Sequence, residues 1–541
     1  MLYLLIIWLI LLPVCLSIGL FVLNLFQDEG FNRQGDRSIL GVWLGIILLS
    51  ISNLAVALIL PLSPLVGMII AVIWVLIAIS SAKTYRELTY LFTSIYPRLL
   101  LQGLVLAIAT AAFISQQIIW FDTGLYHLGS IHWLREYGSV TGLALIQSRF
   151  GFTSSWFAFS APLMPSFIGE NLGAVGNGFI FLITLVWGLI GLYQGLSKNS
   201  ILADWFAVAF SSLIVLIYMA DSANGYSVIS FSSDIPVAFL IGIVAWSLLI
   251  TNNQIIPLIL AIGTFSIKLT AIPLLLLALI FNIRKIQRLF WVLALIFMLL
   301  LPNTLVSLKT SGCPLYPSQL LCLNLPWKVS SETIKAEVNM IGNTSKVDLE
   351  NSQVNPLIQI AKQRYKWLKN SLNFQVTFLA FIVSWGLGIY LFVFRKQNQI
   401  QWVILLGLLG SSFIIIISPF FRFGIGYFIV IPALFVADLL FARKVSFNNV
   451  KFVLLILICI LLFRELPGLN SRWLLPPEVP SVNLAKGQVN DIEYYYPVEP
   501  KFQCWMAQLP CAASPILRRD IQLRNLDKGI QAGFIWKTQS D

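Results

Sequence analysis

The chain has 541 residues, of which 58% are hydrophobic and only 11% are charged. A soluble domain of this length needs far more charge to cover its surface, so the composition excludes an ordinary soluble protein. The formal net charge is +12, but the basic residues lie mainly in short connectors between apolar runs. That distribution is typical of the positive-inside pattern of membrane proteins and does not indicate a nucleic-acid partner.

Runs of about 20 apolar residues recur along the chain, and each is long enough to cross the hydrocarbon core of a bilayer as a helix. The predicted spans are 3–26, 39–60, 64–81, 99–120, 174–195, 203–220, 235–251, 254–267, 269–282, 289–306, 373–394, 400–417, 424–442 and 452–464. The first has no basic n-region and no small-residue cleavage site, which predicts a retained helix and not a signal peptide. We therefore expect an all-α polytopic bundle of about 12 to 14 transmembrane helices over 1–464.

Two of these runs are short and flank Lys268, and they are either two crossings or one long broken helix. If both cross, the basic connectors all fall on the cytoplasmic face, so the charge rule favours two crossings. Three polar stretches are then predicted to lie outside: a first loop at about 121–172, a second loop at about 307–372, and a C-terminal tail over 465–541.

The cysteines fit this orientation. Cys313 and Cys322 share the second outer loop, while Cys504 and Cys511 share the tail. Two close pairs in outward segments predict two small disulfide loops in an oxidising compartment. The alternative is a metal site, but neither pair has the two-residue spacing of a zinc knuckle and no histidine is near, so no metal ligands are assigned.

Two acidic residues occur at predicted outer edges of the spans. Asp122 opens the first outer loop and is followed by Tyr126 and His127, while Asp234 begins a later apolar run. An acid in the interfacial region can act as a base on a lipid-borne substrate. An Asp at a helix N-terminus can equally be an ordinary cap, and the sequence leaves both interpretations open.

Two basic residues occupy comparable positions. Lys268 interrupts an apolar stretch, where a charge is costly unless it reaches water or a partner. It is expected either to hold a phosphate or to extend to the interface. Arg422 lies at another outward edge, and its planar fork suits a phosphate because it donates two hydrogen bonds at once. Interfacial anchoring is the alternative for Arg422.

Taken together, these edges resemble the GT-C superfamily of membrane glycosyltransferases, which have many spans and an acidic residue early in the first large outer loop. The matching pieces are Phe121-Asp122-Thr123-Gly124-Leu125-Tyr126-His127, the Asp234-Ile235-Pro236 helix start, Lys268-Leu269-Thr270, and the stretch 312–318. The closer resemblance is to a poorly characterised bacterial branch known from cyanobacteria and spirochaetes. It is suggested by Gly151-Phe152-Thr153-Ser154-Ser155-Trp156 and by Gln503-Cys504-Trp505 with Leu509-Pro510-Cys511.

The resemblance implies a multi-pass protein of the bacterial plasma (inner) membrane with an extracytoplasmic active site. The donor would be a polyprenyl-phosphate-linked sugar, and the acceptor a glycan or lipid. Asp122 would be the base that deprotonates the acceptor hydroxyl, with inversion at the sugar. The residues expected to bind donor or acceptor are Tyr126, His127, Asp234, Lys268 and Arg422. The one cofactor that the resemblance allows is a divalent cation, but Asp122 has no adjacent second acid, which argues against a metal bound by carboxylates there.

Other functions are compatible with the same sequence. A transporter or flippase of lipid-linked sugars is one, although transporters need polar groups near the bilayer midplane and often carry inverted repeats. No clear repeat is present, and the charges cluster at the outer edge, which favours interfacial chemistry. A non-catalytic scaffold of glycan assembly and an oligosaccharide ligase or polymerase are the remaining alternatives.

Overall fold

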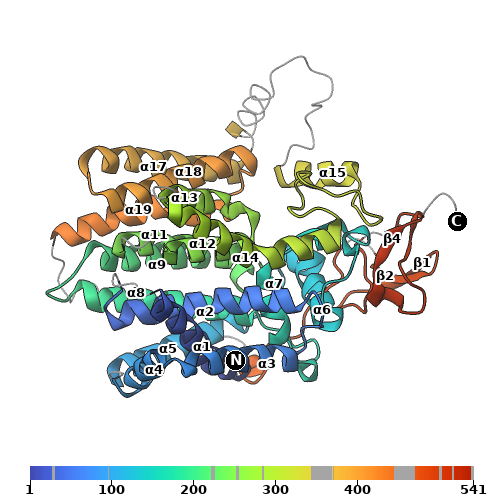
Figure 1. Ribbon diagram of the computed structural model, residues 1–541, viewed down its shortest axis with the longest axis horizontal. Coiled ribbons are helices and arrows are strands. Elements are labelled where there is room, and N and C mark those ends of the chain that lie inside the picture. Colours follow the sequence, from blue (N-terminus) through green and yellow to red (C-terminus); the bar gives the residue numbers. More distant parts are fainter. Residues whose placement is uncertain are drawn as a thin grey trace, which may run out of the picture.

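The computed structural model is mostly helical, with two small antiparallel sheets near the C-terminus (Figure 1). The residues it describes are 1–26, 31–94, 97–220, 226–251, 255–282, 286–342, 368–369, 371–443, 469–498, 502–513 and 517–537.

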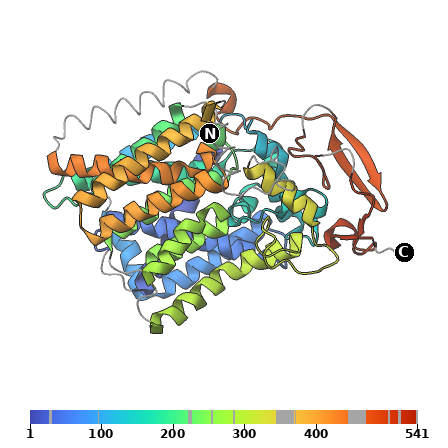
Figure 2. The ribbon, with the colours of Figure 1, turned by 90° about the horizontal axis from the view of Figure 1, so that it is seen from above.

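Nine helices within these ranges are long and apolar enough to cross a membrane. They are α1 (Leu2–Leu25), α2 (Gln34–Val56), α5 (Pro97–Ile114), α8 (Val175–Gly195), α9 (Leu202–Ala220), α14 (Ile286–Ser311), α17 (Leu372–Phe394), α18 (Asn398–Ile417) and α19 (Phe421–Arg443). Their axes run in roughly one direction (Figures 1 and 2). This arrangement is compatible with the predicted all-α polytopic membrane protein. The predicted span 452–464 lies outside the described residues.

One pair of helices departs from the predicted pattern. The predicted span 64–81 corresponds to α3 (Pro64–Ser80), but a second helix, α4 (Ala82–Ser94), follows it at an angle of 100°. The predicted spans 64–81 and 99–120 leave residues 82–98 as a polar connector, and this expectation is wrong for Ala82–Ser94. It is an amphipathic helix, with Thr84 and Leu88 buried. A polar segment can therefore still form a helix when one of its faces packs against the bundle.

The two short runs around Lys268 form separate helices. They are α12 (Ile255–Ile267) and α13 (Ile272–Asn282), joined by the 3₁₀ turn η6 (Leu269–Ala271). Lys268 itself has extended backbone angles, φ −157° and ψ 138°, so it breaks the helix. The two helices pack side by side, and α11 (Asp234–Ile250) packs against α12. The charge rule favoured two membrane crossings that meet at Lys268. The structure has two separate helices that meet there, of 13 and 11 residues, and both are shorter than the nine described helices that are long enough to cross a membrane.

Small residues allow the helices to approach closely. A Cβ atom at Gly19 in α1 would lie 1.7 Å from the carbonyl oxygen of Gly41 in α2. A Cβ at Gly45 would lie 2.0 Å from the carbonyl oxygen of Cys15. Contacts of this kind between small residues are a common way for apolar helices to pack without a hydrophobic driving force.

The polar stretches fold together at one end of the bundle. The first loop holds η1 (Thr123–His127), α6 (Leu128–Tyr137), η2 (Leu143–Leu145), η3 (Ser148–Gly151), α7 (Ser155–Ser160), η4 (Ala161–Leu163) and η5 (Ser166–Ile168). The second loop holds α15 (Ser331–Gly342). The tail holds η7 (Leu469–Arg472), β1 (Leu484–Val489), β2 (Ile492–Pro497), β3 (Ile521–Leu523), η8 (Gly529–Ala532) and β4 (Phe534–Trp536), with β1 paired to β2 and β3 to β4.

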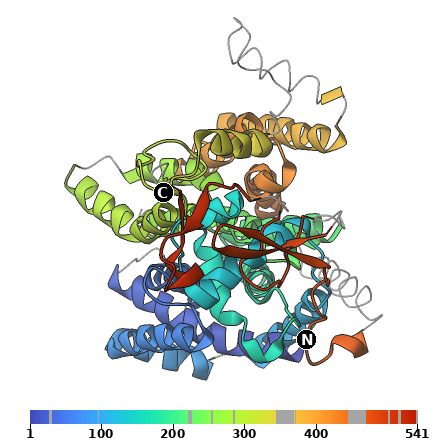
Figure 3. The ribbon, with the colours of Figure 1, turned by 90° about the vertical axis from the view of Figure 1, so that its right-hand side faces the viewer.

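All three stretches contribute to one small hydrophobic core, separate from the core of the bundle. It includes Trp133 from the first loop, Tyr316 from the second, and Ile492 and Phe534 from the tail. Figure 3 views this end of the molecule, with the tail strands in front. Disulfide bonds join Cys313 to Cys322 and Cys504 to Cys511. We call this assembly of the two loops and the tail the cap.

Candidate functional site

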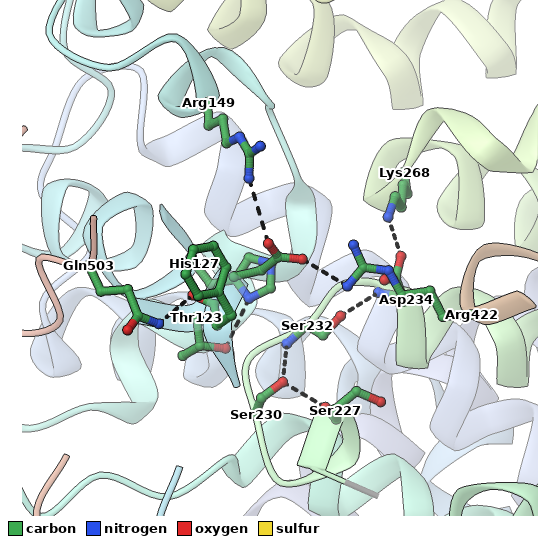
Figure 4. A network of polar contacts seen from close by, with 12 residues as sticks. Thr123, His127, Arg149, Ser227, Ser230, Ser232, Asp234, Lys268, Arg422 and Gln503 are labelled. Atoms are coloured by element: carbon green, nitrogen blue, oxygen red, sulfur yellow. Dashed lines mark hydrogen bonds and ion pairs between the residues drawn. The ribbon is translucent and has the colours of Figure 1, made fainter. Parts of the chain in front are cut away.

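Asp122 lies immediately before η1, a π-helical turn, and makes no capping hydrogen bond to it. Its carboxylate instead accepts a hydrogen bond from Arg422 Nη1, at 2.9 Å from Oδ2. Arg149 Nη1 lies 3.6 Å from Oδ1. Arg422 is near the start of α19 and Arg149 is in η3, so the two guanidinium groups come from different elements (Figure 4). The carboxylate is thus directed at two cations and not at the N–H groups of a helix.

These neighbours decide the charge state of Asp122. Burial raises the pKa of the Asp122 carboxyl, whereas Arg422, His127 and Arg149 together lower it by more. The net pKa lies below the ordinary value for Asp, so the group is ionised at neutral pH. A carboxylate held in this way is a weak base until a cationic partner moves away.

A second ion pair lies close to the first. Asp234 is the first residue of α11, and its Oδ1 accepts a hydrogen bond from Lys268 Nζ. Lys268 Nζ lies 4.3 Å from the centre of the Phe423 ring, and the Arg422 guanidinium carbon lies 4.7 Å from the same centre. Phe423 therefore contacts the cation of each pair, and cation–π attraction favours both contacts.

A chain of serine hydrogen bonds holds the segment before Asp234. The Ser232 hydroxyl accepts a hydrogen bond from the Asp234 N–H, and the Ser230 hydroxyl accepts one from the Ser232 N–H, at 3.3 and 3.1 Å (Figure 4). Asn177 Nδ2 donates to the carbonyl oxygens of Ser230 and Ser232. These bonds satisfy polar groups that are buried, and they fix the backbone from which the Asp234 carboxylate projects.

Arg149 connects the first loop to α15. Its Nε lies 3.6 Å from Oε2 of Glu337, a buried residue of α15, and the Ser148 hydroxyl donates to Oε1 of the same carboxylate. The sequence analysis did not identify Arg149 or Glu337. Arg149 stands two residues before the Gly151–Trp156 stretch that carried part of the resemblance. Nothing in the spacing of the second loop singles out Glu337.

Tyr126 and His127 occupy different surroundings although they are adjacent. The Tyr126 ring packs against Phe152 and Phe157 and lies below the Arg149 guanidinium, 5.8 Å away. His127 is buried, and its Nδ1 lies 3.1 Å from the Thr123 hydroxyl. Burial lowers the pKa of His127 to about 4, so the ring is neutral at physiological pH. His127 therefore supports the π-helical turn from within.

A cavity of about 1000 Å³ is lined by Lys268 of the second ion pair, whereas Asp122 and Arg422 of the first pair do not line it. Tyr126, Ser233 and Lys268 line it next to the charged groups. The lining from α15 and α18 is largely apolar and consists of Ile334, Val338, Ile341, Phe413 and Ile417 beside the polar Lys335 and Asn339. Further polar lining residues are Thr153, Ser154 and Gln319. The cavity can therefore receive a molecule that is apolar at one end, polar at the other, and anionic near Lys268.

The five predicted site residues other than His127 all belong to the ion-pair network or to the cavity wall. Asp122 pairs with Arg422, Asp234 pairs with Lys268, and Tyr126 lines the cavity. Within the described part of the chain, no three His, Cys, Asp or Glu side chains are grouped in a way that could hold a metal ion.

The structure defines a class: a bundle of apolar helices with the dimensions of a multi-pass membrane protein, with a charged network and a cavity beneath a cap. Residues 1–429 match a family described as a domain of unknown function, DUF8201, and the chain belongs to that family. The match includes Asp122, Asp234, Lys268 and Arg422 and ends before the tail. No curated protein and no solved structure matches the chain.

Proposed function

We propose that this protein is a membrane glycosyltransferase of the GT-C type. It transfers a sugar from a polyprenyl-phosphate donor to a glycan or lipid acceptor on the extracytoplasmic face of a bacterial plasma membrane. The observation that carries the proposal is the place of Lys268 in the wall of a cavity of about 1000 Å³, whose lining combines apolar with polar residues. Lys268 pairs with Asp234, and it shares the Phe423 ring with Arg422, the partner of Asp122. A lipid-linked sugar phosphate has the same three parts: an apolar chain, an anion and a polar ring.

The proposed placement of the donor follows the chemistry of the cavity wall. The lipid chain lies along α15 and α18, where Val338 and Ile417 are available. The phosphate lies at Lys268, and the sugar lies towards Tyr126 and Ser154, because aromatic faces and hydroxyl groups suit a sugar ring.

The proposed reaction is a single inverting displacement. The acceptor oxygen attacks the anomeric carbon as the bond from that carbon to the phosphate oxygen breaks. The acceptor proton passes to the Asp122 carboxylate, and the polyprenyl phosphate leaves with the electron pair. Lys268 and Arg422 stabilise the negative charge that grows on the leaving phosphate.

This scheme requires Arg422 to change partners. While Arg422 is bound to Asp122, the carboxylate is a poor base, because its pKa lies below the ordinary value. A donor phosphate competes with Asp122 for the guanidinium, since Arg binds phosphate and carboxylate with the same planar fork. Binding of the donor then releases Asp122 at the moment when the base is needed.

The test compares cell-surface glycans in a deletion strain that carries the wild-type gene, Asp122→Asn or Asp438→Asn, at equal membrane abundance. Asp438 is the matched control, because it also pairs with an arginine at 2.9 Å and its side chain has the same exposed fraction as that of Asp122, 16%. Asn keeps the shape of Asp but cannot take up a proton. We expect wild type and Asp438→Asn to restore the missing sugar and Asp122→Asn to fail.

The other outcomes separate the alternatives. Full restoration of the glycan by Asp122→Asn would show that Asp122 is not the base, and it would favour a transporter or a scaffold. Loss of a whole polymer, with its single repeating unit still made and still attached to lipid, favours a ligase or polymerase. Loss of one sugar residue from an otherwise intact glycan supports the proposed transfer reaction.

A further inference from the structure

The C-terminal tail reaches the backbone on both sides of Asp122. Gln503 Nε2 donates a hydrogen bond of 2.9 Å to the carbonyl oxygen of Phe121 (Figure 4). The backbone N–H of Trp505 donates one of 3.0 Å to the carbonyl oxygen of Gly124. One anchored carbonyl belongs to the residue before Asp122, and the other lies two residues after it.

The Trp505 ring also packs directly on this segment. A Cβ atom at Gly124 would lie 2.4 Å from Cε2 of the Trp505 ring, so only glycine permits the observed approach. Trp505 is buried, and its φ of +47° lies in the left-handed region that non-glycine residues rarely adopt. The surrounding structure must stabilise such a conformation, and conformations of this kind are found most often at functional sites.

The loop that presents Trp505 is itself held in place. The Cys504–Cys511 disulfide closes it, and residues next to Cys511 bond to the middle strand residue Tyr495. The Tyr495 N–H donates to the Pro510 carbonyl oxygen, and the Ala512 N–H donates to the Tyr495 carbonyl oxygen, each at 2.9 Å. The contact on the Asp122 segment is therefore tied to the β1–β2 hairpin of the tail.

We propose that the disulfide-closed loop 503–511 is a positioning element that holds the Asp122 segment in register with Arg422 and Arg149. The inference rests on the proposed function for its effect on sugar transfer. Gln503 and Trp505 act through the backbone of the turn, and neither is a catalytic residue. The tail lies outside the part of the chain that matches the family, so it supplies to the site a contact that residues 1–429 alone do not contain.

The physical basis is the short range of the Asp122 contacts. The Arg422 hydrogen bond is 2.9 Å long, and the turn that directly follows Asp122 is a π-helix, a form that rarely extends beyond one turn. A displacement of about 1 Å in a reacting group can reduce the rate on the order of a hundredfold. Two hydrogen bonds and one ring, all from a cross-linked loop, oppose such a displacement.

The first part of the test measures hydrogen exchange of the full-length protein in lipid nanodiscs, in the peptide covering 118–130. The variants are Trp505→Ala, Trp505→Phe and the double variant Cys504→Ser with Cys511→Ser. Trp473→Ala is the control, because Trp473 is an exposed tryptophan elsewhere in the tail. We expect exchange to accelerate about tenfold or more in Trp505→Ala and the double variant, which corresponds to about 1.4 kcal/mol of opening free energy. Trp505→Phe and Trp473→Ala should match wild type.

The second part measures glycan restoration by the same variants at equal abundance. Positioning predicts loss for Trp505→Ala and rescue by Trp505→Phe, because both variants keep the backbone donor but only Phe keeps an aromatic ring against Gly124. Unchanged exchange in Trp505→Ala overturns the inference even if the double variant fails to fold. Faster exchange with full glycan restoration also overturns it, because the segment then needs no positioning. If wild type itself restores no glycan, the proposed function fails, and the exchange data alone decide whether the loop holds the segment.

Discussion

Arg422 donates a hydrogen bond of 2.9 Å to Asp122 although 300 residues separate the two in the chain. The bond joins the start of α19 to the turn at the beginning of the cap, so it couples the bundle to the cap as well as setting the charge state of the acid. Both side chains are mostly buried. An ion pair in such a place should be visible in the stability of the protein as well as in its activity.

Arg422→Gln should lower the stability of the purified protein, because it leaves Asp122 with Arg149 as its remaining cationic neighbour at 3.6 Å. In the double variant with Asp122→Asn, the loss should be smaller than the sum of the two single losses, with a coupling free energy of roughly 0.5 to 3 kcal/mol. The measurement is the thermal unfolding of wild type, the two single variants and the double variant in detergent. Additive losses would show that the two residues do not interact in solution.

The residues of this pair could be chosen from the sequence, but their partnership could not. Asp122, Asp234, Lys268 and Arg422 each stood out because a charge at the edge of an apolar run is costly and needs a reason. Which acid meets which base depends on how α19 and α12 pack beneath the cap. The helices pack through apolar surfaces, and the sequence of such a surface does not indicate which other helix it contacts.

Other features had weaker signals in the sequence. Arg149 and Glu337 lie in two different loops of the cap, and no periodic pattern of apolar residues in the sequence links their positions. They meet only because the two loops fold against each other. The helix α4 was missed because its polar residues are typical of a connector, although one face is buried. The common side of the three polar stretches followed from the charge rule alone, and the structure brings them together in one cap.

The two histidines of the chain should make its stability depend on pH in a defined window. Burial lowers the pKa of His127 from 6.5 to about 4, and burial lowers that of His132 to about 4 as well. Below pH 6.5 the unfolded chain takes up protons that the folded protein does not. Stability should therefore fall as the pH drops from about 6.5 to about 4, by up to about 3 kcal/mol for each histidine.

His127→Asn should remove about half of this dependence, because His132 remains. The measurement is the unfolding midpoint in detergent between pH 4 and pH 7.5, compared with wild type. The Asp122 carboxylate does not interfere, since its pKa is lowered and the stability that it contributes is lost only below about pH 4. Equal slopes in the two proteins would show that His127 takes up its proton without unfolding the turn.

Variants of Lys268 and Asp234 can distinguish a structural role of this ion pair from a role in phosphate binding. Lys268→Met should destabilise the protein, because the Asp234 carboxylate is buried and loses its hydrogen-bonded cation. Adding Asp234→Asn removes the unpaired charge and should restore most of the unfolding midpoint. Glycan restoration should remain absent in the double variant, since the phosphate has lost the cation at its proposed binding position and Arg422 alone remains. Recovery of both properties together would indicate a purely structural ion pair.

The cavity wall can be tested with two neighbouring positions of α15. Val338 lines the cavity and Met340 does not, yet their exposed fractions are nearly equal, 47% and 48%. Val338→Trp should fill part of the space assigned to the lipid chain and abolish glycan restoration. Met340→Trp adds a similar bulk to the same helix outside the cavity and should leave restoration intact.

We expect this contrast because an indole at position 338 occupies cavity volume that a bound molecule would need. The change in exposed surface is similar in the two variants, so it does not account for a difference between them. Membrane abundance and thermal unfolding should be similar for the two proteins, and both quantities need to be measured with the glycan. If Val338→Trp and Met340→Trp restore the glycan equally well, the donor does not lie along α15. If both variants fail at normal abundance, α15 acts through its outer surface, and the result does not support binding of the donor in the cavity.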